Sequence, residues 1–582
     1  MEEKNKIFPV HITSLLLLSG LLSVGAIFAQ DPTASENISV QQSWERYKIE
    51  RQIKQVTAPE PALKVTSPQL PPPDIGGKST EKIFKLKNVV FDPPEPKGVS
   101  RNELDAIKAK YVAMDSVSIY DLYCMVVEID NLFDAKSILA RAGLPVQDVK
   151  NGIVEVQIIE GRKATKTPTT MAPSRLGIGR TFVLSKRLMG QRFIRDQFHF
   201  SEESSFNIEE LENEMLRYNR IFNSRIETGI EPGDEPGEYK LNLTRKLPQL
   251  LSGGYRIDNT GRESSGVIRN GFHFTFSDVL GTDDSFFISY DKTEGTSALY
   301  LQGKIPISTF GTFLDMSYYS GEPKTTSGPF AALLINGKSV QYRPGIRQII
   351  FNEKNYRLDF TLNYENYDSQ TYFDKALNYA EKHESSTLGF EYSGKSALFA
   401  GFSLTMGSAD TLTLPYPDYK KNRFKLMKMN AMKVWSGLQA VDDTFILRGN
   451  ASVSLSDLPP SQSFQIGGMS TVRGAPEAFV SGETGYLIVA EYRVPVWRGT
   501  KNYFPNSKAE IFTFFDQGGV FDRKTSNNEF LFSIGIGGTI RIDRYFSLTA
   551  LYGKPVFKTE ASKIYRDQLK SGNASFTLGV SF

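Results

Sequence analysis

Apolar and polar residues alternate along most of the chain after residue 250. The last segment shows the pattern most clearly, with Phe576, Leu578, Val580 and Phe582 on one face and Ser575, Thr577, Gly579 and Ser581 on the other. A period of two residues is typical of β-strands, and an apolar face opposite a polar face is typical of strands that separate lipid from a water-filled lumen. Clusters of Asp, Gly, Asn and Ser between these segments predict turns.

The length of this region predicts the size of the sheet. At about 10 residues for each membrane strand, plus turns and loops, residues 250–582 accommodate about 16 antiparallel strands. A soluble β-sandwich would need a second sheet to cover the aromatic face, whereas a closed barrel needs none and leaves no open edge. The pattern therefore predicts an all-β transmembrane barrel over residues 250–582.

Apolar residues three and four positions apart predict helices before the barrel. In residues 80–163, Ser100 with Glu103 reads as a helix-capping box, and a second helix starts at Ser118 with Asp121 in its first turn. The expected buried face of the second helix is Ile119, Leu122, Val126, Ile129 and Phe133. The expected strands are 83–91, 137–141 and 153–159. The order is therefore β-α-α-β-β, an α+β unit.

Residues 170–247 repeat this plan. Asn207 caps a helix with Glu210 in place. Its expected buried face is Ile208, Leu211, Met215, Tyr218 and Phe222. A hairpin follows at 225–230 and 239–244, joined by a turn-rich Pro-Gly connector. The sequence thus predicts a second α+β unit.

The first 79 residues divide into three segments of different composition. Residues 1–29 have a basic start, an apolar run and a small residue, Ala29, at the exit, and they predict a secretory signal peptide more than a membrane anchor. Residues 30–57 contain a nearly polar helix pattern; such a helix is either unstable in isolation or surrounded by polar material, and a disordered tail is the alternative. Residues 58–79 hold six prolines and predict an extended linker.

Composition narrows the function. The 582 residues include 68 basic and 65 acidic ones, a net charge of +3 that gives no reason to expect a nucleic-acid partner. The chain has one cysteine, Cys124, so no disulfide can form within it, and its four histidines are scattered. No nucleophile or paired-carboxylate motif accompanies them. We therefore expect no catalytic residues, no metal site, no cofactor and no enzymatic activity.

Two short motifs stand out in the barrel region. The stretch from Ile466 to Gly474 is rich in Gly, Ser and Thr and carries one cation, Arg473, near its end. Residues 512–520 read as an aromatic strand with one carboxylate, Asp516, which needs a partner there. An Arg on a loop that folds back into the barrel would supply that partner.

At these motifs the chain resembles the outer-membrane transporters of two-partner secretion, the haemolysin secretion/activation (ShlB/FhaC/HecB) family of the BamA-like superfamily. The resemblance implies that a loop-tip motif of Val472, Arg473 and Gly474 enters the lumen. There Arg473 would meet Asp516 of a strand motif completed by Phe514 and Gly518. Many members carry an aromatic residue after the Val-Arg-Gly tip, where this chain has Ala475.

Other stretches add to this resemblance. Glu491, in the strand after the loop, and Asp258 and Asn259, in the early barrel, are similar to supporting motifs of the family. The units at 80–163 and 170–247 resemble its first and second POTRA domains, and residues 30–57 its N-terminal plug helix. The terminal Phe resembles the assembly signal of outer-membrane proteins, which implies the barrel assembly machinery as a partner during biogenesis.

The family resemblance implies the function. We expect a cell outer-membrane protein, bounded by outer-membrane lipid, with POTRA domains in the periplasm. It would translocate a secreted partner protein bearing an N-terminal secretion domain, and Arg473 would act as a structural latch. The alternative is a BamA- or TamA-like factor that assists insertion of other barrels; insertases usually have more POTRA units and no proline linker. A passive porin would not need the two preceding units.

Overall fold

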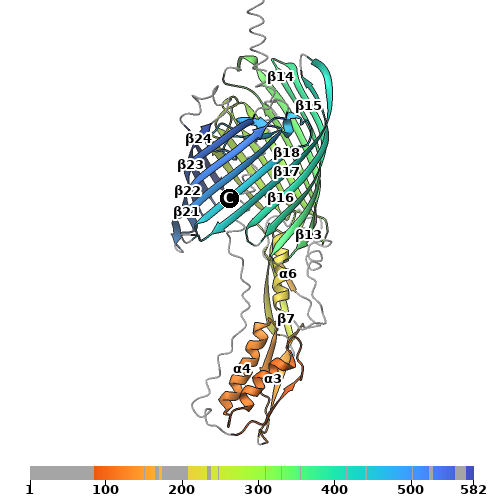
Figure 1. Cartoon of the computed structure of the whole chain (residues 1–582), viewed down its shortest axis with the longest axis vertical. Helices are drawn as coiled ribbons and strands as arrows, with labels where there is room; N and C mark the ends of the chain where they lie inside the picture. Colours follow the sequence, from red (N-terminus) through yellow and green to blue (C-terminus); the bar gives the residue numbers. More distant parts are fainter. Residues whose placement is uncertain are drawn as a thin grey trace, which may run out of the picture. The chain divides into compact units, whose positions relative to one another are not determined.

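The computed structural model describes residues 84–149, 151–163, 170–173, 208–232, 238–246 and 248–582, the last range with gaps at 309, 329–330, 354, 395, 414–415, 439–441, 501–502, 524–527 and 558–571. The expected signal peptide, plug helix and linker lie outside these residues, as does Asn207. The described residues fall into two compact units, one within residues 60–248 and one over 249–582. Figure 1 shows their elements in sequence colours.

The first part of the smaller unit has the expected β-α-α-β-β order. Its elements are β1 (Asn88–Asp92), α3 (Arg101–Val112), α4 (Ile119–Ala135), β2 (Ala140–Gly143) and β3 (Ile153–Glu160). The sheet order is β1-β3-β2, with β3 parallel to β1 and antiparallel to β2. Two strand boundaries were predicted wrongly: residue 84 forms only an isolated bridge to 117, and the strand expected at 137–141 begins at Ala140. Ser137 cannot start that strand because its φ is +58°.

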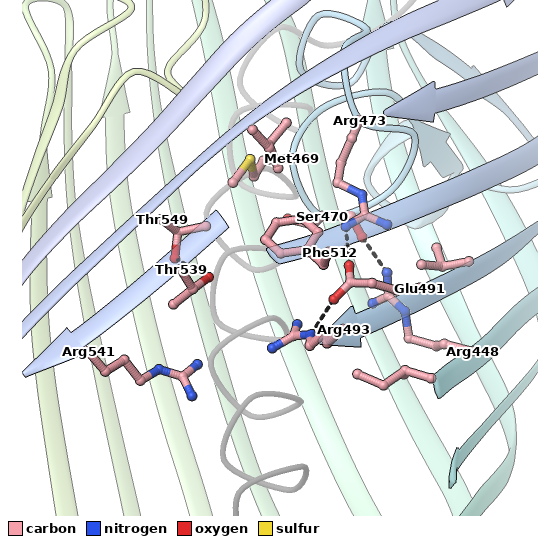
Figure 2. Close-up of a pocket in the computed structure, with 13 residues that line it drawn as sticks. Arg448, Met469, Ser470, Arg473, Glu491, Arg493, Phe512, Thr539, Arg541 and Thr549 are labelled. Carbon is pink, nitrogen blue, oxygen red and sulfur yellow. Dashed lines mark hydrogen bonds and ion pairs between the residues drawn. The ribbon is translucent and has the colours of Figure 1, made fainter. Parts of the chain in front are cut away.

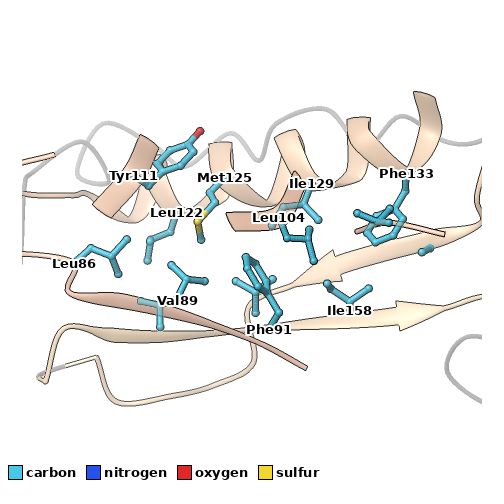
Figure 3. Packing of buried hydrophobic residues seen from close by; sticks show 14 of the residues in the cluster. Leu86, Val89, Phe91, Leu104, Tyr111, Leu122, Met125, Ile129, Phe133 and Ile158 are labelled. Atoms are coloured by element: carbon cyan, nitrogen blue, oxygen red, sulfur yellow. The ribbon is translucent and has the colours of Figure 1, made fainter. Parts of the chain in front are cut away.

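Apolar side chains of α3 and α4 pack on this sheet (Figure 3). Leu104, Met125, Ile129 and Phe133 are completely buried. Ile119, expected on the buried face of α4, is 42% exposed, and Met125 faces the core instead. The buried positions 122, 125, 129 and 133 are spaced three or four residues apart, as one face of a helix requires. The predicted face differed because it began at residue 119, the first residue of the helix.

Both helix starts carry the expected caps. The Ser100 N–H donates to a Glu103 carboxylate oxygen at 2.9 Å, and the Ser118 N–H donates to Asp121 at 2.8 Å. The Lys136 ammonium, 2.6 Å from Glu103, and Ser100 lower the pKa of the Glu103 carboxyl to about 2. The caps satisfy amide groups that a helix start otherwise leaves without partners.

The second part of this unit contains one described helix and four strands. They are β4 (Arg162–Lys163), β5 (Thr170–Pro173), α6 (Ile208–Ile221), β6 (Arg225–Pro232) and β7 (Glu238–Lys246). The central strand β7 pairs with β4 and β5 in parallel and with β6 in an antiparallel hairpin, as expected for 225–230 and 239–244. On α6, the side chains of Leu211, Met215 and Tyr218 are buried.

The larger unit is a closed antiparallel barrel of 16 strands, which confirms the prediction from alternation. The strands are β8 (Leu251–Asp258), β9 (Arg269–Ser277), β10 (Ser285–Lys292), β11 (Thr296–Pro306), β12 (Thr312–Pro323), β13 (Ile335–Asn352), β14 (Tyr356–Phe373), β15 (Ala376–Gly394), β16 (Leu398–Thr413), β17 (Tyr416–Ser436), β18 (Thr444–Ser454), β21 (Thr484–Thr500), β22 (Tyr503–Phe521), β23 (Asn528–Ile542), β24 (Phe546–Phe557) and β25 (Asn573–Ser581). Each pairs with its neighbours in sequence, and β25 pairs with β8.

The two faces of the barrel wall have opposite chemistry. On β23, Ile534 and Ile536 point outward and are more than half exposed, whereas the alternate residue Ser533 is completely buried inside. Charged side chains such as Asp359 and Glu381 are also buried on the interior face. Apolar exposure outside and polar burial inside is the arrangement that lipid requires.

The seam between the first and last strands is short. Five residues of β25, 577–581, pair with 254–258 of β8. Asn259 extends the seam, because its Nδ2 donates to the carbonyl of Ala574 at 2.9 Å and its Oδ1 accepts from the Phe576 N–H at 2.8 Å. Backbone hydrogen bonds also join Phe582 to Gly253.

Among the helices of the described residues, none is both long and apolar enough to cross a membrane.

Candidate functional site

The candidate site is built around the long loop between β18 and β21, residues 455–483. The loop contains a short helix, η3 (Pro460–Gln462), and two short strands, β19 (Phe464–Ile466) and β20 (Val480–Gly482), which pair with each other. This pairing folds the loop into a hairpin whose tip carries the Val-Arg-Gly sequence. Buried tip residues, Val472 and Arg473 among them, show that the hairpin packs against the interior wall.

The structure brings Arg473 and Asp516 together. The guanidinium Nε and Nη2 donate to the two carboxylate oxygens of Asp516 at 2.8 and 2.7 Å, a two-point contact. The Arg473 backbone N–H adds a third hydrogen bond to the same carboxylate at 3.0 Å. The side chains are only 9% and 0% exposed. A planar guanidinium that meets a carboxylate through two bonds fixes orientation as well as distance.

Glu491, the supporting residue expected on the next strand, joins the same cluster. It accepts from Arg473 Nη1 and from Arg493 Nε (Figure 2). The guanidinium carbon of Arg473 also lies 3.7 Å from the ring centroid of Phe514, a cation–π contact. Within this cluster two arginines and two carboxylates balance in charge, which lowers the cost of burying each ion.

Packing around the tip is close. Val472 is completely buried in a cluster with Ile466, Val489, Val520 and Leu531. Gly474 has a φ of +87°, and a Cβ there would lie 2.3 Å from the carbonyl oxygen of a β24 glycine. A side chain at this position would therefore be both strained and sterically blocked.

The remaining expected residues lie in different places. Gly518 faces the loop, because a Cβ there would come 3.0 Å from Ile466 Cδ1. Asp258 is not at the loop tip and instead pairs with Arg256 and Arg269 at 3.1 and 3.2 Å. Asn259 lies at the barrel seam. The loop contacts thus include Glu491 but neither Asp258 nor Asn259.

Three tip contacts were not anticipated from the sequence. Arg448 Nη2 donates to the carbonyl of Ser470 at 2.7 Å, and Asn573 Nδ2 donates to the carbonyl of Gly474 at 3.0 Å. The hydroxyl of Ser533 donates to the carbonyl of Arg473. These side chains belong to three other strands, and ordinary Arg, Asn and Ser residues in alternating strands give no local signal of such a role.

The arrangement suits holding and releasing a loop, not bond chemistry. The tip residues described above are joined by ion pairs and by hydrogen bonds to backbone groups. None of these contacts pairs a nucleophile with a base. Within the part of the chain that the structure describes, no group of three or more His, Cys, Asp or Glu could hold a metal ion. A pocket beside the tip is lined by four arginines, Arg448, Arg473, Arg493 and Arg541, among other residues (Figure 2).

Sequence comparison finds relatives among known transporters. Outer membrane transporter CdiB of Dickeya dadantii is 23% identical over 380 residues, which span 62% of this chain and 64% of that protein. CdiB of Escherichia coli O6:K15:H31 is 23% identical over 364 residues, 60% of this chain and 58% of that protein. The matches thus cover less than two thirds of the length of these curated relatives.

Solved structures show the same fold. CdiB from Escherichia coli superposes with a TM-score of 0.61 at 17% identity, covering 95% of this chain and 99% of that one. BamA from Haemophilus ducreyi, lacking POTRA domains 1–3, gives a TM-score of 0.50 at 13% identity, covering 86% of this chain and 100% of that one. At these identities the likeness shows a shared fold.

The family model of the haemolysin secretion/activation protein ShlB/FhaC/HecB matches residues 237–540, which include most of the barrel and the whole loop. The match covers more than half of the chain. A closed barrel of 16 strands agrees with the outer-membrane location of the CdiB relatives. The chain therefore belongs to the haemolysin secretion/activation (ShlB/FhaC/HecB) family, and its location is the outer membrane.

Proposed function

We propose that this chain exports a secreted partner protein from the periplasm to the cell surface. The observation that carries the proposal is the family match across the barrel, at whose interior wall Arg473 holds the long loop. A loop held by ion pairs, hydrogen bonds and an apolar cluster, all of them non-covalent, can yield to a passing chain without any covalent step. Binding and folding of the partner outside would drive the passage, since the periplasm offers no ATP.

The α+β units would be periplasmic POTRA domains that capture the extended partner. In the sheet of the first unit, β1 and β2 are the edge strands. An extended peptide can add to such an edge through main-chain hydrogen bonds, with pockets for alternate side chains giving specificity. We propose the domain boundaries 80–163 and 170–247, and a partner whose N-terminal secretion domain supplies the extended segment.

Arg473 would be the latch that keeps the loop docked. Its partners Asp516 and Glu491 come from two neighbouring strands, β22 and β21, so release of the tip would not unpair the barrel wall. The proposed site residues are the tip motif Val472, Arg473 and Gly474 and the strand motif Phe514, Asp516 and Gly518. The partners during biogenesis would be outer-membrane lipid and the barrel assembly machinery.

A factor that inserts other barrels is the second candidate, favoured by the fold likeness to BamA. The two candidate functions predict that different proteins are lost when this chain is absent. An exporter affects one secreted protein, whereas an insertase lowers the amounts of many outer-membrane barrels.

The experiment is a deletion of the gene for this chain, tested with any large secreted protein encoded beside it. We expect that protein to vanish from the cell surface and medium and to return with the wild-type chain. Total outer-membrane barrels, measured by heat-modifiable gel mobility, should stay constant. Normal secretion with a broad loss of barrels would replace the export proposal with the insertase.

A further inference from the structure

A buried histidine on the barrel wall connects two carboxylates. His383, on β15, lies with Nδ1 2.9 Å from Glu381 and with Nε2 2.9 Å from Glu365, which is on β14. The side chains of His383 and Glu381 are completely buried, and that of Glu365 is 10% exposed. The ring stacks on Tyr367 at 4.8 Å between centroids and meets Phe424 edge-on at 5.8 Å.

The positions of the two carboxylates require a proton on both ring nitrogens of His383. A neutral imidazole carries one N–H and would leave its other nitrogen facing a carboxylate lone pair, whereas the doubly protonated ring donates on both sides. One cation between two carboxylates leaves this trio with a net negative charge. Additional hydrogen-bond donors are needed for the remaining carboxylate oxygens, because a buried charge without such donors is costly.

The wall supplies one such donor, the Tyr379 hydroxyl, which donates to Glu381 at 2.9 Å, and the long loop supplies others. The Ser461 hydroxyl donates to Glu381, and the Ser461 N–H points at the other oxygen of that carboxylate at 3.4 Å. Gln462 Nε2 donates to Glu365 at 3.0 Å. Both loop residues belong to η3 and lie about as close to the ring nitrogens, at 3.3 Å each. The start of the loop thus adds donors on both carboxylates to a cluster in which the wall supplies the Tyr379 hydroxyl.

This contact is distant from the latch along the barrel. It uses β14 and β15, whereas the Arg473 contact uses β21, β22 and β23, and three strands, β16 to β18, stand between β15 and β21 in the barrel order. The two contacts also hold different parts of the loop, the short helix η3 and the hairpin tip. These two contacts lie on separate sectors of the wall, and a further hydrogen bond joins Asn422 Nδ2 of β17 to the carbonyl of Asp457 at 2.9 Å.

We propose that Glu365, Glu381 and His383 form a second docking site that positions the start of loop 455–483 independently of Arg473. Release of the tip would then leave η3 on β14 and β15, and full withdrawal of the loop would need both contacts to break. The inference rests on the proposed export function for its purpose, because only a passing partner requires the loop to withdraw. The docking itself can be measured without any export.

The test measures how fast a cysteine introduced beside η3 reacts with a maleimide, and it is simple because the chain has one native cysteine to remove. In the full-length protein, Cys124→Ser removes the native thiol and Ser463→Cys places a reporter just after η3. We expect His383→Gln to raise the rate of maleimide labelling at position 463 by about tenfold, because the variant removes the cation that joins the two carboxylates holding η3. The matched control is Glu391→Gln, which removes a carboxylate from the same strand that pairs with Arg347 and not with the loop.

A second measurement, trypsin cleavage of the loop, distinguishes loss of the η3 contact from a general loosening of the barrel wall. Arg473 is the only Lys or Arg in residues 455–483, so trypsin cleavage inside the loop reports on the tip alone. We expect His383→Gln to leave the rate of this cleavage within about twofold of wild type, whereas general loosening of the wall would raise both readings together. Labelling equal to that of Glu391→Gln, or a matching rise in both readings, would overturn the proposal.

Should His383→Gln fail to assemble, as judged by heat-modifiable mobility, the loop side offers an alternative. Ser461→Ala with Gln462→Ala removes the two side-chain donors of the loop, keeps the Ser461 backbone N–H and leaves the wall unchanged. The same rise at position 463 with a protected Arg473 is expected. An unchanged labelling rate in this variant would also overturn the second docking site.

Discussion

Replacing Asp516 with Ala is the sharpest test of the latch. The change removes three hydrogen bonds from Arg473, two from the guanidinium and one from its backbone N–H. In a wet lumen the pair would contribute only about 1 kcal/mol, but with side chains 9% and 0% exposed it belongs to the buried class. Loss of one partner of a buried pair costs about 3–5 kcal/mol. Because Arg473 keeps Glu491, we expect about 3 kcal/mol.

Trypsin measures this change directly. A cost of about 3 kcal/mol corresponds to a rise of roughly 100-fold in the released population, at 1.4 kcal/mol per factor of ten. When release and docking are fast relative to cleavage, the cleavage rate after Arg473 follows that population. We therefore expect Asp516→Ala to be cut there about 100 times faster than wild type, with the barrel still shifting its gel mobility on heating.

The control and the coupling test complete the argument. Asp359→Ala removes a comparably buried carboxylate from β14 that pairs with Arg347 and Arg357, and cleavage in the loop should not change. A cysteine at Ala475, in a Cys124→Ser background, allows labelling of Arg473→Ala, Asp516→Ala and the double variant. We expect the double variant to differ little from either single one. Additive effects would show that the two residues act separately and would refute the latch.

Three further outcomes are expected. Gly474→Ala should raise trypsin cleavage of the loop at least tenfold, because its φ is +87° and its Cβ would clash, whereas Gly437→Ala, at +70° with open space around it, should not. Asn259→Ala should lower the temperature of the heat-induced mobility shift, since two hydrogen bonds at the seam are lost, and the exposed Asn366→Ala should not. Deletion of residues 31–57 should raise ion conductance in planar bilayers without abolishing export; unchanged conductance would favour a disordered tail.

The fold could be predicted because its signals are local. Alternation along one strand, as in 575–582, depends on neighbours two positions apart and identified the barrel, and the length of residues 250–582 gave its 16 strands. Capping residues such as Ser100 and Ser118 act within three positions, and both helix starts were found. The predicted start of a strand was wrong where the backbone conformation of one residue set the boundary, as at Ser137.

The site could be predicted only in part. Arg473 and Asp516 were singled out as a lone cation and a lone carboxylate in the barrel region, and the family resemblance paired them and added Glu491. Contacts such as Ser533 to Arg473 or Gln462 to Glu365 join residues 60 and 97 positions apart. Such pairs depend on strand register and on the path of the loop, and a single sequence without this register gives no sign of them.

The seam between β8 and β25 has a consequence for how the barrel forms. Asn259 and Phe576, which meet there, are 317 positions apart, whereas the other neighbouring barrel strands are consecutive in the chain. Consecutive hairpins close short loops and form early, but this pairing must close the longest loop in the barrel and comes late. Until then β8 and β25 are free edges of a curved sheet, with unpaired amide groups that could join another chain. The order of folding thus places the greatest risk of aggregation just before closure, on the two strands that Asn259 connects.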